Sequence, residues 1–134
     1  KYLSGGKQSC KLTIRTVTGA GLNAGMHHSQ SLYALAAHIP GIKIAIPSTP
    51  YDAKGLLVTA IRGDEPVIIF ENKTLYNTKG HVPEESYEIP IGKAKIVKNG
   101  KDATIVTISR MLSTAGRGNN YTISFKNRAP CNSG

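Results

Sequence analysis

In the first part of the chain, short apolar runs alternate with segments whose apolar positions recur at helical spacing. Residues 12–16, 42–46 and 67–70 are compact runs rich in Ile, Val and Leu, as in strands of a covered sheet. Residues 32–39 and 53–61 instead repeat apolar side chains at i, i+3, i+4 and i+7, the pattern of amphipathic helices. The order strand, helix, strand, helix, strand predicts an α/β fold in which right-handed crossovers pack helices on a parallel sheet.

The second predicted helix carries start and stop signals at both ends. Thr49 is a suitable N-cap, Pro50 fits the first helical position, and Asp52 adds negative charge to the first turn. Gly63 is placed to end the helix. Gly55 inside the helix costs about 1 kcal/mol relative to alanine, so we expect another backbone to pack close to it.

The pattern changes in the second half of the chain. Residues 72–90 are largely polar and predict a long excursion over the surface. Two apolar runs, at 92–98 and 103–109, then flank Asn99-Gly100, which is the strongest short hairpin signal. The sequence therefore predicts one β-hairpin after the long loop.

Composition indicates a globular domain with a basic surface. The 134 residues include 40% hydrophobic and 19% charged residues, with a formal net charge of +9, which suits one ordinary core. The lysines are scattered with little aromatic interleaving, so we expect no nucleic-acid partner. No apolar run approaches the roughly 18 residues of a membrane span, and we expect no membrane partner and a cytoplasmic protein. Cys10 and Cys131 lack metal or redox spacing, which favours free thiols over a disulfide.

Several stretches of the chain are similar to one enzyme family. They are HSQSLYALAAHIPG at 28–41, STPYDAKGLL at 48–57 and VPEESYEIPIGKA at 82–94. Over residues 1–114 the chain resembles the β subunit of the thiamine-diphosphate-dependent 2-oxo acid dehydrogenases, in the pyruvate and acetoin dehydrogenase group. The resemblance then stops, so we expect a truncated fragment of such a subunit.

The resemblance implies three parts along the chain. Residues 1–88 correspond to the carboxyl-side part of a pyrimidine-binding, transketolase-like domain. Residues 89–115 correspond to the linker and first hairpin of a transketolase-like C-terminal domain. Residues 116–134 have no helical period and no family character. A shifted reading frame or an unrelated tail explains them better than a divergent ending, and we expect this tail to be disordered.

The family's activity sets the expected function. Its members decarboxylate a 2-oxo acid, or cleave acetoin, on thiamine diphosphate and pass the acyl group to the lipoyl-lysine of an acyltransferase. They assemble as α2β2 heterotetramers in which the α subunit binds Mg²⁺ and the diphosphate. The family's glutamate and aromatic residues around the aminopyrimidine ring correspond to positions upstream of residue 1. We therefore assign no cofactor-binding residue to this chain and expect it to be inactive alone.

His28 is the candidate catalytic residue. It ends a loop just before a predicted helix, where the helix dipole favours a neutral imidazole that can exchange a proton near neutral pH. It also matches the histidine of the family's HSQ motif, which lies at the active-site mouth and assists the substrate or the lipoyl group. His27 stands where the family usually has glutamine. A histidine that only caps or packs at the helix start is the alternative interpretation.

The neighbours of His28 carry weaker signals. Ser29 and Gln30, or Ser31, are expected to cap the first helix and to contact a neighbouring subunit. No acidic residue lies near them in sequence, so a Ser-His-acid triad is poorly supported. The glycines of the preceding loop match neither phosphate-binding spacing, and TVTGAGLN departs from the family's usual TPGGAGRG.

A potassium site is implied by the resemblance alone. Some family members hold K⁺ with backbone carbonyls around the segment that matches AIRGDEP here. The corresponding positions are Leu12, Ala60, Ile61, Gly63 and Glu65. The last turn of a helix offers unpaired carbonyl oxygens, so the chemistry is coherent, and an ordinary helix C-terminus is the alternative.

A non-catalytic interpretation competes with the enzyme. The chain would then be a basic α/β binding or assembly module whose surface meets an acidic partner. Tight binding to a polyanion that falls steeply with added salt would favour this module, and negligible affinity would exclude it.

Overall fold

A computed structural model describes residues 3–116 and 122–123 of the chain. It divides into two compact units, Lys1–Ile91 and Gly92–Gly134. The first unit contains the predicted sheet and both predicted helices. The described elements of the second unit are short.

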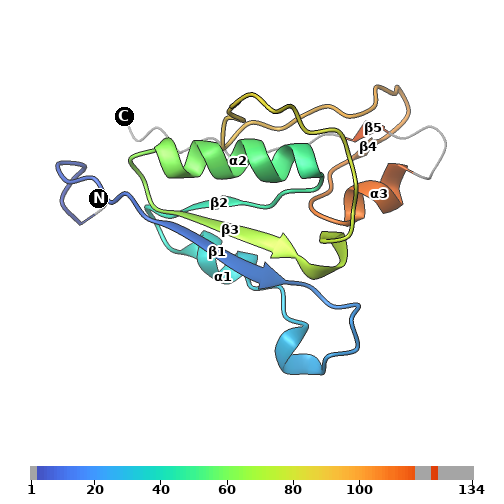
Figure 1. Cartoon of the computed structure of the whole chain (residues 1–134), viewed down its shortest axis with the longest axis horizontal. Coiled ribbons are helices and arrows are strands. Elements are labelled where there is room, and N and C mark those ends of the chain that lie inside the picture. Colours follow the sequence, from blue (N-terminus) through green and yellow to red (C-terminus); the bar gives the residue numbers. More distant parts are fainter. Residues whose placement is uncertain (1–2, 117–121, 124–134) are drawn as a thin grey trace. The chain divides into compact units, whose positions relative to one another are not determined.

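The first unit is built on a three-stranded parallel sheet (Figure 1). Its strands are β1 (Thr13–Thr18), β2 (Lys43–Ala45) and β3 (Val67–Asn72), in the order β1-β3-β2. β3 pairs with both neighbours, and its burial reflects this central place, because Val67, Ile69 and Phe70 are all buried. The predicted parallel sheet and α/β fold are confirmed.

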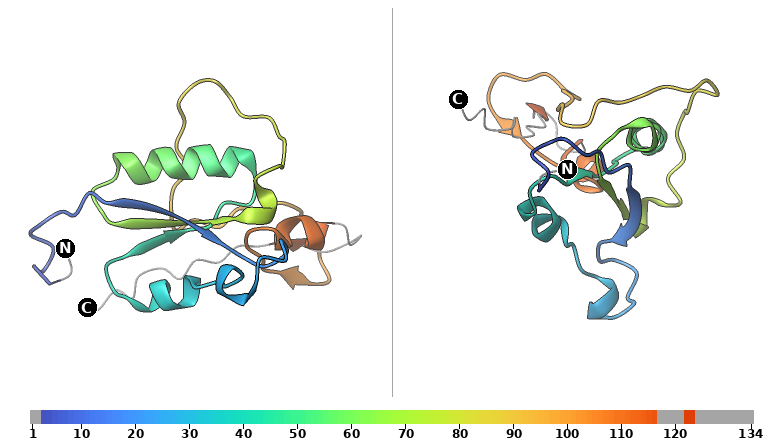
Figure 2. Two further views of the ribbon diagram at one scale, coloured as in Figure 1. Left: turned by 60° about the horizontal axis from the view of Figure 1, so that its bottom comes forward. Right: turned by 90° about the vertical axis from the view of Figure 1, so that its left-hand side faces the viewer.

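Two helices cover opposite faces of this sheet. α1 (Tyr33–His38) connects β1 to β2, and α2 (Pro50–Arg62) connects β2 to β3; Figure 2 shows them on the two sides. Because the two crossovers run in opposite directions across the sheet, equal handedness places their helices on opposite faces. The core on the α2 side is a small apolar cluster from α2, β2 and β3, to which Ile91 is added from the segment after the long loop. Its members are Ala45, Leu56, Leu57, Ala60, Val67, Ile69 and Ile91.

The start of α2 follows the sequence prediction closely. The Asp52 backbone N–H donates to Thr49 Oγ1 at 3.1 Å, and Pro50 occupies the first helical turn. The Asp52 carboxylate in turn accepts a hydrogen bond from the Ser48 backbone N–H at 3.3 Å. Gly63 is the C-cap, as predicted. This reciprocal capping fixes where the chain turns from β2 into α2.

The predicted side-chain cap of α1 is wrong. Leu32 is the N-cap residue and makes no side-chain hydrogen bond to the helix. Ser29 instead ends a short 3₁₀ helix, η1 (Met26–His28), and its hydroxyl donates to the Gly25 carbonyl at 2.7 Å. The hydroxyl of Ser29 is therefore bonded within the 3₁₀ turn and does not cap α1.

Gly55 lies under a close crossing of another segment, as predicted. The Ile89 backbone N–H donates to the Gly55 carbonyl at 3.3 Å. A Cβ at Gly55 would lie 2.6 Å from Ile89 Cγ1 and 2.7 Å from the Tyr87 ring. The glycine therefore permits the segment after residue 80 to pack directly on α2.

The second unit contains β4 (Thr104–Ile105), α3 (Met111–Gly116) and β5 (Thr122–Ile123). β4 pairs with β5 in parallel, and the described residues 92–99 contain no strand, so the antiparallel hairpin predicted across Asn99-Gly100 is wrong. Within 92–99 only Lys98 has a strand-type bridge. Ile96 and Val97 are 61% and 49% exposed, and a two-stranded ribbon without a covered apolar face has little to stabilise it.

Two predictions concern the ends of the chain. Cys10 is a free, exposed thiol, while Cys131 lies outside the described residues. Most of the predicted disordered tail at 116–134 also lies outside them.

No helix of the described part is long and apolar enough to cross a membrane.

Candidate functional site

The carboxyl ends of the three strands meet at one edge of the sheet. β1 ends at Thr18, β2 at Ala45 and β3 at Asn72. In open parallel sheets this edge is where ligands bind, because loops there can converge without breaking the ladder. The polar groups that follow the three strands are therefore candidates for the functional site.

The loop between β1 and α1 is closed at its base. The Gln30 carbonyl accepts from the Gly19 backbone N–H and from Thr18 Oγ1, both at 3.0 Å. Gly19 has a φ of 91°, and a Cβ there would lie 2.6 Å from Asn72 Nδ2. Glycine is therefore required at this position for both backbone conformation and space.

His28 lies on this loop, in η1, and is exposed to solvent. Its ring centroid is 4.2 Å from that of His27, with the two planes tilted by 49°. A cavity of about 130 Å³ opens beside both imidazoles. Its lining residues are Thr16, Val17, Thr18, His27, His28, Gln30, Leu32, Phe70 and Lys73.

The ionisable side chains that line this small cavity are all basic. Lys73 lies on its wall beside the two histidines, and none of its described lining residues is a carboxylate. Thr16, Thr18 and Gln30 add neutral polar groups. The arrangement suits a ligand that accepts hydrogen bonds, with an imidazole able to donate or accept a proton at the mouth.

A larger cavity of about 460 Å³ lies beside α2. Its apolar wall includes Leu57, Val58 and Ile61 from the helix, and its polar wall includes Arg15 and Glu71 from neighbouring strands. Leu57 and Ile61 belong to the predicted apolar face of α2, whereas Val58 and the contact between Arg15 and Glu71 were not predicted.

Arg15 and Tyr76 both bind the Glu71 carboxylate. Arg15 donates to its two oxygens at 2.5 and 2.9 Å, and the Tyr76 hydroxyl donates to Oε2 at 3.1 Å. The hydrogen bond from Arg15 lowers the pKa of Glu71 most, partial burial opposes this, and Tyr76 lowers it further. Burial and the carboxylate raise the pKa of Tyr76. Glu71 is therefore a fixed anion.

The residues of the implied potassium site come from two adjoining segments. The Leu12 carbonyl accepts from the Val67 backbone N–H at 2.8 Å, which joins the start of β1 to the segment after α2. A Cβ at Gly63 would lie 3.2 Å from the Thr59 carbonyl oxygen and 3.6 Å from that of Ala60. The Thr59 carbonyl already accepts from the Gly63 backbone N–H at 3.0 Å, as at an ordinary helix end.

The carboxylate beside this turn is engaged elsewhere. Glu65 forms an ion pair with Lys43. A cation held here would bind carbonyl oxygens rather than this side chain, as the family pattern implies. Within residues 3–116 no group of three or more His, Cys, Asp or Glu side chains could hold a metal ion.

Sequence reasoning missed Lys73 and the Arg15–Glu71 pair. Lys73 lies forty-five residues from His28 in sequence, and no spacing links the two. Arg15, in the middle of β1, reaches Glu71, near the end of β3, because β3 lies next to β1, with Glu71 opposite Val17. The available signal was one charged residue of opposite sign in each of two strands that belong to one parallel sheet.

The comparison with protein families decides the classification. The family described as "Transketolase, pyrimidine binding domain" matches residues 1–79, more than half of the chain. The chain belongs to this transketolase pyrimidine-binding domain family. Membership accounts for the parallel sheet and supports thiamine diphosphate, in general terms, as the cofactor of the proteins that carry this domain.

Curated relatives resemble most of the chain. It is 51% identical over 115 residues to "Acetoin:2,6-dichlorophenolindophenol oxidoreductase subunit beta" of Bacillus subtilis (strain 168), covering 86% of this chain and 34% of that protein. It is 50% identical over 111 residues to "Pyruvate dehydrogenase E1 component subunit beta" of Porphyra purpurea, covering 83% and 34%. It is 46% identical over 108 residues to "2-oxoisovalerate dehydrogenase subunit beta" of Bacillus subtilis (strain 168), covering 80% and 33%. The chain spans about a third of the length of these relatives.

A solved structure supports the fold. A chain described as "Split gene transketolase, inactive beta4 tetramer" matches with a TM-score of 0.61 at 17% sequence identity. The match covers 89% of this chain and 40% of that one. At this identity the likeness concerns the arrangement of helices and strands alone.

Proposed function

We propose that this chain forms part of the β subunit of a thiamine-diphosphate-dependent dehydrogenase acting on acetoin or a 2-oxo acid. The observation that carries the proposal is the 51% identity, over 115 residues, to an acetoin oxidoreductase β subunit. The position of His28, exposed at the carboxyl edge of a parallel sheet, supports it. The proposed reaction is oxidative decarboxylation, or acetoin cleavage, followed by acyl transfer to lipoyl-lysine.

In this proposal the protein's part is orientation and electrostatics. Thiamine diphosphate, when bound, supplies the electron sink for the carbon–carbon bond that breaks. His28 would stand at the mouth of the site and donate or accept a proton, or a hydrogen bond, as the acyl group passes to the lipoyl arm. The walls of the small cavity beside it carry the neutral polar groups of Thr16, Thr18 and Gln30 and no described carboxylate, which suits a carbonyl-bearing substrate.

The partners follow from the same relatives. We propose assembly with an α subunit into an α2β2 heterotetramer that works with a lipoyl-bearing acyltransferase. The α subunit would bind Mg²⁺ and the diphosphate, since this chain offers no cluster of metal-ligating side chains among its described residues. The name "subunit beta" of the relatives supports a companion chain.

Two further assignments belong to this proposal. Residues 1–88 would be the carboxyl-side part of the pyrimidine-binding domain and 89–115 the start of the next domain, which agrees with a division of the structure after Ile91. A K⁺ ion would be held by carbonyl oxygens of Leu12, Ala60, Ile61, Gly63 and Glu65. The last turn of a helix offers carbonyl oxygens, and such oxygens of α2 lie beside Gly63, which is consistent with the ion.

The test uses the full-length β subunit assembled with its α subunit. His28→Ala should lower acyl transfer to a lipoyl domain by about 10²-fold, the usual effect of losing a proton-transfer group. His81→Ala removes another exposed histidine and should leave the rate unchanged. Wild-type rates for His28→Ala, in both decarboxylation and acyl transfer, would sink the assignment of this residue.

A further inference from the structure

The loop that carries His28 is bound to the sheet through a side chain from another strand end. Lys73 Nζ donates a hydrogen bond to the backbone carbonyl of His28. Lys73 is the first residue of the 3₁₀ helix η2 (Lys73–Leu75), directly after β3. This contact joins the carboxyl ends of β1 and β3 across the small cavity.

Few hydrogen bonds hold this loop to the sheet, so the contact from Lys73 matters for its position. Thr18, Gly19 and Gln30 close its base, but every residue from 20 to 28 is exposed to solvent. Exposed loops with few buried contacts open at low free energy. A hydrogen bond from an ammonium group is stronger than one between neutral groups, so Lys73 can restrain the loop at His28.

Lys73 is itself held in a defined place. Asn72 is only 4% exposed, and its side chain accepts from the Thr74 backbone N–H at 3.0 Å and the Thr74 hydroxyl at 2.8 Å. The same Asn72 side chain lies beneath Gly19, at the start of the His28 loop. The turn after β3 therefore supports both ends of the loop, through Asn72 at one end and Lys73 at the other.

We propose that Lys73 is a positioning residue that fixes the backbone of His28, and hence the place of its imidazole at the cavity mouth. This inference rests on the proposed role of His28 in acyl transfer. Lys73 acts through the His28 carbonyl and needs no contact with the substrate. Small displacements of a reacting group cost large factors in rate, so release of this tie should slow the step in which His28 takes part.

The test is a double-mutant cycle in the full-length β subunit assembled with its α subunit. Lys73→Met should lower kcat for acyl transfer to a lipoyl domain about tenfold with KM nearly unchanged, because alignment rather than binding is lost. Lys73→Arg keeps a cationic donor and should retain the rate within about threefold. Lys79→Met, which removes an exposed lysine a few residues further on, should have no effect.

The cycle separates this role from general damage. In the His28→Ala background Lys73→Met should change the rate by less than about twofold, because residues that act together are not additive. An equal tenfold loss in both backgrounds would overturn the positioning role while leaving the proposed function standing. A His28→Ala enzyme with full activity would instead contradict the proposed role of His28, on which this inference rests.

A second measurement does not depend on activity. Amide hydrogen exchange of residues 25–29 should become faster in Lys73→Met, while that of β3 stays the same. Unchanged exchange in the loop would show that the hydrogen bond from Lys73 to the His28 carbonyl does not restrain it. Faster exchange throughout β3 would mean that the substitution damages the sheet, and would also count against the proposal.

Discussion

Arg15 on β1 and Glu71 on β3 form a two-point ion pair between neighbouring parallel strands. Arg15 Nε lies 2.5 Å from Glu71 Oε1, and one terminal guanidinium nitrogen lies 2.9 Å from Oε2. The arrangement closes one wall of the larger cavity at the edge of the sheet. It also makes the stability of the domain depend on pH.

The pair predicts a loss of stability in acid. Arg15 holds the pKa of Glu71 below its ordinary value of 4.5, so the folded state favours the carboxylate. The stabilisation is fully present above pH 4.5 and is lost as the pH falls through the lower pKa of the folded state. Because the Arg15 side chain is 60% exposed, Arg15→Met should cost only about 0.5–1 kcal/mol at neutral pH.

Denaturant unfolding of the full-length protein at several pH values measures this effect. The difference between wild type and Arg15→Met should shrink steadily below pH 4.5, where Glu71 becomes protonated. Lys11→Met removes a pair with Asp64 that is exposed on both sides and serves as the control. A difference between wild type and Arg15→Met that stays constant down to the most acidic pH would contradict the ionic account.

Gly55→Ala should destabilise the domain although alanine is the better helix former. The added Cβ would lie 2.6 Å from Ile89 Cγ1, so either α2 or the crossing segment must move. The expected loss is about 1–3 kcal/mol of unfolding free energy, which exceeds the gain of about 1 kcal/mol in helix propensity. Thermal unfolding measures it, with Gly116→Ala as the control, because a Cβ at Gly116 meets open space. Stabilisation by Gly55→Ala would refute the packing.

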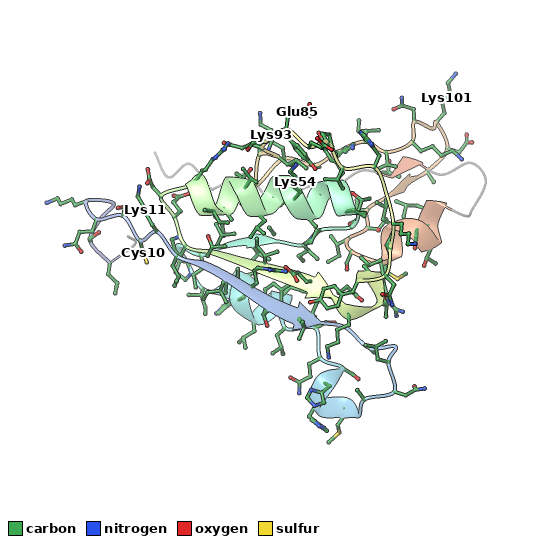
Figure 3. The ribbon with its side chains drawn as sticks, in the orientation of Figure 1. Cys10, Lys11, Lys54, Glu85, Lys93 and Lys101 are labelled. Atoms are coloured by element: carbon green, nitrogen blue, oxygen red, sulfur yellow. The ribbon has the colours of Figure 1, made fainter. Side chains whose placement is uncertain are left out.

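Lys54 holds the acidic segment near the end of the long loop. Its ammonium group donates to the carbonyls of Pro83, Glu84 and Glu85, at 3.0 Å for the latter two, and lies 5.3 Å from the Tyr87 ring centroid. Figure 3 shows Lys54 on α2 and Glu85 on the segment beside it. One side chain thus satisfies three consecutive backbone acceptors.

Lys54→Met should release this segment without unfolding the sheet. We expect a loss of about 1 kcal/mol, because the freed carbonyls can bind water, and faster hydrogen exchange at residues 85–89. Lys79→Met provides the control for loss of an exposed positive charge. If exchange at these residues matches that of the wild type, the three bonds do not hold the segment.

Potassium should stabilise the full-length protein if the carbonyls around Gly63 bind it. The melting temperature should rise with K⁺ concentration and reach a plateau, as binding to the folded state requires. Choline at equal ionic strength controls for screening by salt. An identical melting temperature in the two salts would argue that the end of α2 is an ordinary helix terminus.

The sequence predicted those parts of the fold that depend on neighbouring residues. Thr49 and Pro50 specify the start of α2 within one turn of chain, and the apolar run of β3 requires cover on both faces. The cap of α1 could not be predicted in this way, since Ser29 is taken up by η1. The hairpin signal at Asn99-Gly100 also failed, because a turn-forming pair does not supply an apolar face for its strands.

Of the residues in the candidate site, His28 was the one that the sequence predicted. His28 stands out in the sequence by its place between a loop and a helix. Lys73 becomes a neighbour of that region only because β3, the last of the three strands along the chain, lies between β1 and β2 in the sheet. Contacts that depend on strand order have no local signature, so they require the structure.

The proposed function places this domain in a thiamine-dependent dehydrogenase that needs a second subunit. The most direct measurement is reduction of an artificial electron acceptor by the full-length β subunit with its α subunit, thiamine diphosphate and either acetoin or a 2-oxo acid. We expect turnover with all components, and background rates when the α subunit, the β subunit or the cofactor is left out. Turnover that persists without the β subunit, or a cofactor-loaded assembly inert toward acetoin and every 2-oxo acid tried, would contradict it.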